Sequence, residues 1–87
     1  MFRFERLRVW QKAIELYDVA DSVADTLPRR SRFVLPDQLR RAALSISSNI
    51  AEGSGRETLR ESQHFFTIAK GSAFEVVSIA TVCRRRG

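Results

Sequence analysis

The sequence has one cysteine, one histidine and no long run without charge. A single cysteine, Cys83, excludes a disulfide framework within the chain, and Cys83 with His64 cannot supply a zinc site from this chain alone. The longest uncharged runs, 42–51 and 76–83, are far shorter than the roughly 20 residues that span a bilayer. Residues 1–10 alternate charged and apolar side chains, unlike a signal peptide. We therefore expect a soluble protein of a reducing cytoplasm, with no membrane partner.

Lysine is also scarce. Arginine supplies 13 of the 15 basic residues, against 10 acidic ones, and the formal net charge is +5. The planar guanidinium donates well to phosphate and carboxylate, whereas solubility alone is served equally by lysine, so this composition favours a polyanionic partner. Arginine-rich codons of a GC-rich genome would explain the same preference, and the sequence alone leaves both explanations open.

Glycine and proline are few, and apolar residues recur three or four positions apart in three stretches. This period predicts antiparallel helices over about 5–26, 36–53 and 58–84 in a single domain that spans residues 1–87. Pro36 suits the first turn of the second helix, Gly53 suits a left-handed residue at its end, and Thr58 with Glu61 forms a capping-box pattern before the third helix. The expected fold class is all-α, an antiparallel up-and-down helical bundle.

The third predicted helix carries apolar or small residues over about half of its circumference, more than a helix with one packing partner needs. We expect it to contact at least two neighbours. Because a chain this short builds only a marginal core, a second subunit is an expected source of one of them. On the first helix, Trp10 and Tyr17 lie seven residues apart on the apolar face, a spacing more typical of a core than of a base-stacking platform.

Polar residues flank the apolar stripe of the second helix and meet others on the third. Buried polar groups need partners, which predicts an interhelical hydrogen-bond network, with Gly71 beside it allowing close approach. Glu52 and Glu75 would alternatively form an acid–base pair or half of a metal site, but the Glu-x-x-His spacing of ferritin-like sites occurs once, at Glu61 and His64. The structural network is favoured; no catalytic residue, metal ligand or cofactor is predicted, and no enzyme activity is expected. The predicted members are Gln38, Ser45, Asn49, Glu52, Ser72 and Glu75.

Arginines gather in clusters that are candidates for nucleic-acid binding. Clustered positive charge holds phosphates without recognising bases, which gives sequence-tolerant and salt-sensitive binding. The alternative is a solvated, salt-bridged surface, since Glu57 and Glu61 lie beside Arg60; for a single subunit this alternative is favoured. A ring of subunits would instead repeat each cluster into a basic band. The candidate residues are Arg29, Arg30, Arg32, Arg40, Arg41, Arg56 and Arg60, and a further basic cluster is Arg3, Arg6, Arg8 and Lys12.

Four motifs resemble one known family. They are LRVWQKA at 7–13, LPDQLRRA at 35–42, SISSNIAEG at 45–53, and IAKGS at 68–72 followed by Glu75. The sequence resembles the small four-helix bundle proteins encoded in intervening sequences of bacterial 23S rRNA genes, a family similar to the accessory variability determinant of diversity-generating retroelements. By position, the motif residues are Gln38, Arg41, Ser45, Asn49, Glu52, Gly53, Gly71, Ser72 and Glu75, and the resemblance implies roles in fold or assembly.

The resemblance also implies a ring-shaped homopentamer with a positively charged surface. In the retroelement branch it implies RNA or DNA and a reverse transcriptase as partners of a non-enzymatic accessory factor. Family members continue into a fourth helix, whereas this sequence ends near the end of its third, so we expect a four-helix type of bundle with the fourth helix missing or truncated. The leading hypothesis is an oligomeric nucleic-acid-binding accessory factor; the alternative is a structural or protein-interaction module without nucleic-acid binding.

Overall fold

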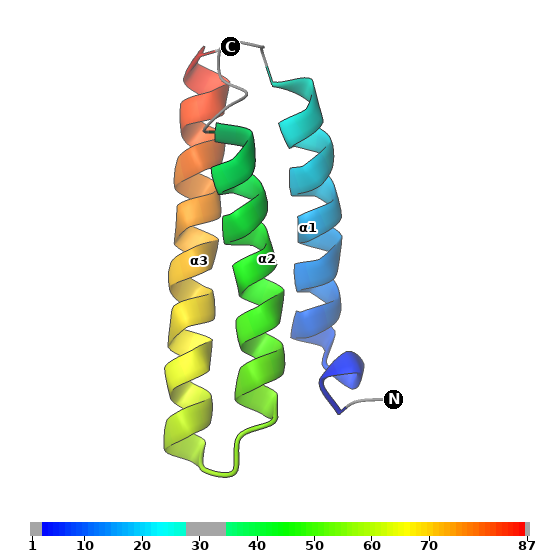
Figure 1. Cartoon of the computed structure of the whole chain (residues 1–87), viewed down its shortest axis with the longest axis vertical. Helices are drawn as coiled ribbons and strands as arrows, with labels where there is room; N and C mark the ends of the chain where they lie inside the picture. The colour runs from blue at the N-terminus through cyan, green and yellow to red at the C-terminus, as the bar shows by residue number, and fades with distance from the viewer. Residues whose placement is uncertain (1–2, 28–34, 87) are drawn as a thin grey trace.

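The computed structural model describes residues 3–27 and 35–86, which form three α-helices and one short 3-10 helix (Figure 1). The elements are η1 (Arg3–Arg6), α1 (Arg8–Thr26), α2 (Leu35–Ser54) and α3 (Leu59–Arg86). Successive α-helices run in opposite directions, and α2 lies between α1 and α3 (Figure 1). The described residues contain no strand and no fourth helix. The predicted all-α, up-and-down bundle is confirmed.

Local signals explain the starts of the helices. Before α1, the chain forms η1, and the side-chain amide of Gln11 donates to the carbonyl of Glu5 at 3.0 Å, which ties η1 to the first turns of α1. One half of the predicted capping box before α3 is confirmed: the backbone N–H of Glu61 donates to Thr58 Oγ1 at 3.2 Å. The Glu61 carboxylate accepts from the Thr58 hydroxyl at 3.2 Å and not from the Thr58 backbone N–H that the motif would use.

Gly53 has a different role from the predicted one. It lies inside α2, and its backbone is not in the left-handed region, so it does not end the helix. A Cβ at this position would lie 2.6 Å from Cε1 of Phe66 and 3.1 Å from the carbonyl oxygen of Ser62. The Ser62 hydroxyl also donates to the Gly53 carbonyl at 2.7 Å. Glycine is therefore required because α3 approaches the α2 backbone closely.

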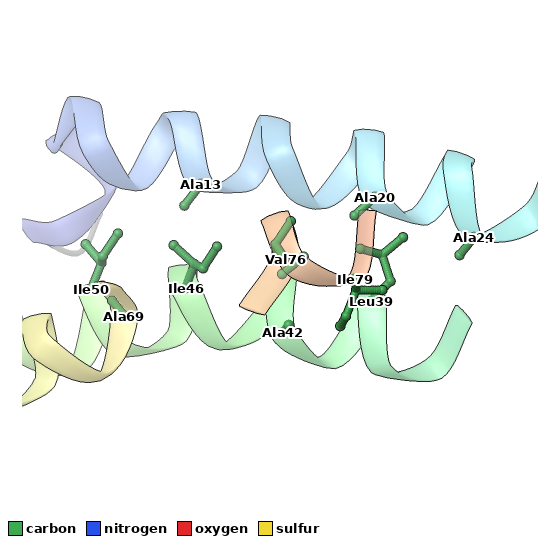
Figure 2. Close-up of a cluster of buried hydrophobic side chains, with 11 residues drawn as sticks. Ala13, Ala20, Ala24, Leu39, Ala42, Ile46, Ile50, Ala69, Val76 and Ile79 are labelled. Atoms are coloured by element: carbon green, nitrogen blue, oxygen red, sulfur yellow. The ribbon is translucent and has the colours of Figure 1, made fainter. Parts of the chain in front are cut away.

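The core forms where α1 and α3 pack on α2. In α1 the buried residues are all alanines, at positions 13, 20 and 24. Figure 2 shows Ala13 facing Ile46 of α2, and Ala20 near Leu39 of α2 and Ile79 of α3. The absence of bulk on α1 allows it to lie close to α2. Trp10 and Tyr17 are half-buried and pack against this core, as their spacing predicted.

Much of the apolar surface of α3 is uncovered. The helix packs chiefly on α2 and buries Ala69, Val76 and Ile79, whereas Phe74 is 65% exposed and Val77 63%. A Cβ on Gly71 would meet no atom within 4 Å, so the expectation that Gly71 allows close helix approach is wrong within one chain. Among the described residues, no helix other than α2 makes an extensive contact with α3.

Residues 59–83 of α3 are long and apolar enough to cross a membrane, and no other described segment is. Only 17% of the most apolar 18-residue stretch within this segment is buried. The sequence-based expectation considered only uncharged runs, and Lys70 and Glu75 interrupt this one. A charged side chain at the centre of a bilayer costs about 2.5 to 3.5 kcal/mol on insertion scales. Lys70 and Glu75, near the middle of this segment, would each carry this cost.

Candidate functional site

A small polar cluster joins α2 to α3. The Ser72 hydroxyl donates to Ser45 Oγ at 2.8 Å, and the Asn49 amide donates to the carbonyl of Ser45 at 2.8 Å and to Ser45 Oγ at 3.0 Å. All three side chains are half-buried. Within the described ranges, no buried side-chain polar atom is left without a hydrogen bond. The cluster therefore links the two helices and satisfies its own polar groups.

The other predicted members of this network lie elsewhere, and their placement corrects the prediction. Gln38, Glu52 and Glu75 are exposed. Glu52 accepts a hydrogen bond from Arg56 at 2.8 Å, one turn further along the chain. Neither Gln38 nor Glu75 bonds to a described residue. Water solvates these three side chains, so they need no interhelical partner, and no contact supports the alternative of a Glu52–Glu75 acid–base pair.

Arg40 ties α2 to α1. Its Nε donates to Asp21 Oδ1 at 2.7 Å and its terminal nitrogen donates to Asp25 Oδ1 at 2.6 Å. The hydrogen bond that Arg40 donates to Asp21 raises the pKa of Arg40 above its ordinary value; desolvation opposes this shift, and the charges of the nearby carboxylates add to it. Arg40 was predicted to bind nucleic acid, and in the structure two of its three guanidinium nitrogens donate to carboxylates within the chain.

The remaining candidate arginines differ in how far they are engaged. Arg56 pairs with Glu52, and its guanidinium lies 4.5 Å from the centre of the Phe65 ring. Arg41 and Arg60 are exposed and make no ion pair with a described residue. Four further cations share that property: Arg6, Arg8, Lys70 and Arg85.

The arginine clusters lie at opposite ends of the bundle. Arg41 lies near the start of α2, whereas Arg56 and Arg60 lie beyond its end, where α2 turns into α3 (Figure 1). With a rise of about 1.5 Å per residue, the length of α2 separates them by roughly 20 to 25 Å. One chain therefore presents two basic ends instead of one continuous patch. The predicted cluster Arg29, Arg30 and Arg32 lies outside the described residues.

Two openings in the surface flank α2. The first is a mostly apolar groove of about 330 Å³, and the second is a cleft of about 330 Å³ between η1 and the end of α2. The sequence analysis identified neither opening. The signal that it could have used is Phe4, which follows Arg3 and lies two residues before Arg6, an aromatic side chain beside basic ones. The groove is lined by Val9, Ile46, Ile50, Phe66, Ala69, Lys70 and Ala73, and the cleft by Phe4, Ala51, Glu52, Gly55 and Arg56.

Neither opening contains a cluster suited to metal chemistry. The described residues include no group of three or more His, Cys, Asp or Glu side chains placed to hold a metal ion. His64 is exposed and packs beside the ring of Phe65, with centroids 5.3 Å apart. What the surface does offer is unpaired cations, one aromatic-lined cleft and one apolar groove.

Comparison with known proteins gives one result that covers almost the whole chain. The family model described as 23S rRNA-intervening sequence protein matches residues 5–87. A comparison with curated proteins found no match. The matched range contains the three described α-helices, the polar cluster and most of the residues that line the cleft. The chain belongs to the 23S rRNA-intervening sequence protein family.

Proposed function

We propose that this protein is a non-enzymatic, oligomeric nucleic-acid-binding factor. The observation that carries the proposal is the set of six exposed cations without an ion-pair partner among the described residues, Arg6, Arg8, Arg41, Arg60, Lys70 and Arg85, on a chain of net charge +5. Cations that are not neutralised within the chain are available to phosphates, and their binding releases counterions from the nucleic acid.

Oligomer formation follows from the uncovered apolar surface. The groove between α1 and α3, together with Phe74 and Val77, leaves apolar side chains in water that a second copy would cover. Repeating the two basic ends around a symmetry axis would bring charges from different chains together, which one chain cannot do alone. A ring of five follows the family resemblance, and a reverse transcriptase would be a partner in a retroelement setting.

Titration of a fluorescein-labelled 12-nucleotide RNA at low and at physiological salt tests nucleic-acid binding. We expect binding at low salt that weakens steeply as salt rises, with a slope that grows with the number of phosphates contacted. The variant Arg60→Gln should weaken binding and reduce the slope by about one unit, since this side chain has no structural partner to lose. Absence of binding at low salt would contradict the proposal.

Solution mass tests the oligomer. Light scattering coupled to size exclusion should give a mass above that of one 9.9 kDa chain. Val9→Asp places a charge in the apolar groove and should shift the protein toward the monomer. The matched control, Ser22→Asp, adds the same charge at an exposed position of α1 that does not line the groove. A folded wild-type monomer at micromolar concentration would refute assembly.

The exposed groove specifically favours a second function, a protein-interaction module without nucleic-acid binding. The two functions differ in the RNA titration: the interaction module predicts no salt-dependent binding, although Val9→Asp would still disrupt assembly.

A further inference from the structure

The cleft between η1 and the end of α2 has the size and the chemistry of a site for one nucleobase. Its volume, about 330 Å³, lies at the small end of the range for ligand pockets, where a single base fits. Its lining combines an aromatic ring, a carboxylate and a guanidinium, from Phe4, Glu52 and Arg56. We propose that this cleft binds the guanine of an unpaired nucleotide, an inference that rests on the proposed nucleic-acid binding and adds base preference to it.

The cleft walls are held in place. Phe4 packs against Trp10 with ring centroids 5.1 Å apart at 61°, which fixes an aromatic side chain at one wall. Arg56 is held from two directions, by the carboxylate of Glu52 at 2.8 Å and by the ring of Phe65 at 4.5 Å. Unpaired bases stack on aromatic rings and guanidinium planes, and single-stranded RNA is recognised in this way. Duplex RNA keeps its bases stacked inside the helix and would not enter.

Small residues keep the cleft open. A Cβ on Gly55 would approach only backbone carbonyl oxygens, those of Glu52 at 3.7 Å and Ala51 at 3.8 Å. Position 55 therefore leaves bare backbone where a side chain would occupy the cleft, and Ala51 adds only one methyl group. A planar base can thus reach the backbone at the end of α2.

The polar groups select guanine. Its Watson–Crick edge carries two adjacent donors, N1–H and the 2-amino group, beside the acceptor O6. A carboxylate accepts from both donors as a bidentate pair, and a neighbouring guanidinium donates to O6. Glu52 and Arg56 supply these two groups side by side. Uracil offers one donor, which lies between two carbonyl oxygens. A carbonyl oxygen facing the carboxylate would be repelled by it, so uracil fits the cleft poorly.

Cations for the flanking phosphates lie at the same end of the bundle. Arg6 is two residues after Phe4, and Arg60 lies in the first turn of α3, four residues after Arg56. Both are exposed and make no ion pair with a described residue. The base would therefore provide specificity in the cleft while these arginines supply the salt-dependent part of the affinity.

The test uses 12-nucleotide oligouridines with one central guanine, inosine or uracil, titrated by fluorescence anisotropy at low salt. Inosine lacks only the 2-amino group, so it removes one of the two donors. We expect the guanine probe to bind about tenfold more tightly than the inosine and uracil probes, within the range for a bidentate base contact. Equal affinities for all three would overturn the guanine site while leaving nucleic-acid binding intact; absence of binding for all three would overturn both.

Variants separate the cleft from general affinity. Glu52→Gln preserves the size of the side chain but faces the guanine donors with an amide that itself donates, so the ratio of guanine-probe to uracil-probe affinity should fall to about one. The affinity for the uracil probe should stay equal or rise, because a negative charge is lost. Phe4→Ala should weaken the guanine probe about fivefold or more. Val19→Ala, the control, trims an exposed apolar side chain of α1 that lines neither the cleft nor the groove and should change nothing. A retained guanine preference in Glu52→Gln, with a native melting curve, would refute the site.

Discussion

Two glycines in helices should respond in opposite directions to the same substitution. In Gly53→Ala the new Cβ would lie 2.6 Å and 2.8 Å from two ring carbons of Phe66 and 3.1 Å from the Ser62 carbonyl, so both neighbours must move. Overpacking of this kind costs roughly 1 to 3 kcal/mol. The gain in helix propensity from glycine to alanine, about 1 kcal/mol in a helix interior, is smaller here because Gly53 is next to the last residue of α2.

The net expectation is a loss of about 1 to 2 kcal/mol for Gly53→Ala, which lowers the Tm by about 4 to 8 °C per kcal/mol in a domain of this size. The same change at Gly71 meets no atom within 4 Å and should stabilise by about 0.5 to 1 kcal/mol. Urea and thermal melts monitored by circular dichroism at one protein concentration measure both, since association makes the Tm concentration-dependent.

A double-mutant cycle with Phe66 identifies the cause. When Phe66→Ala removes the ring, Gly53→Ala should lose most of its cost, because only the Ser62 carbonyl remains close. A coupling energy of about 1 kcal/mol or more is expected between positions that are in direct contact. If Gly53→Ala stabilises as much as Gly71→Ala, or if the cycle shows no coupling, the close approach of α3 to α2 does not explain the glycine.

Three further outcomes follow from the contacts. Arg40→Gln should lower the Tm, and the difference from wild type should shrink in 1 M NaCl, because it removes the bonds to Asp21 and Asp25. Folding raises the pKa of Arg40, so its stabilising contribution is complete at every pH below its unfolded-state pKa and is lost only as the pH rises through its folded-state pKa. A Tm difference between wild type and Arg40→Gln that fell between pH 7 and 9 would contradict this reasoning. Ser72→Ala should cost about 1 kcal/mol in urea melts, since it leaves the half-buried Ser45 hydroxyl with one partner fewer. Asn49→Ala should lower stability before it affects RNA binding, and equal stability with lost binding would assign Asn49 to the interface.

The fold was predictable because helix period and caps are local properties. Each apolar stripe, and the Thr58–Glu61 pair, depends on residues only a few positions apart, so the sequence alone contains the information that they require. The 3-10 turn before α1 was missed: the first helix was predicted to begin at about residue 5, and no glycine or proline separates Arg3–Arg6 from α1. Ser45 and Ser72 were both predicted members of an interhelical network, and the bond between them links α2 to α3, although the sequence did not identify this particular pair.

The candidate site was less predictable because its contacts depend on how the helices dock. Arg40 meets carboxylates 19 and 15 residues earlier, a pairing that only the α1–α2 contact determines. Glu75 follows the half-buried Ser72 by three residues, yet it faces solvent, since a small rotation of α3 decides which flank is covered. The clash that explains Gly53 likewise comes from Phe66, on another helix.

The positions of the two openings allow assembly and base binding to coexist. Ile46 and Ile50 line the apolar groove, whereas Ala51 and Gly55 line the cleft. At about 100° per residue, Ala51 lies roughly 140° around α2 from Ile46, and Glu52 lies roughly 120° from Ile46 in the other direction, so the cleft opens on a different side of the central helix from the groove. A second copy seated in the groove would leave the cleft accessible. Each subunit of a ring would then offer one base site, and several sites on one RNA strand would raise the overall affinity far above that of a single cleft.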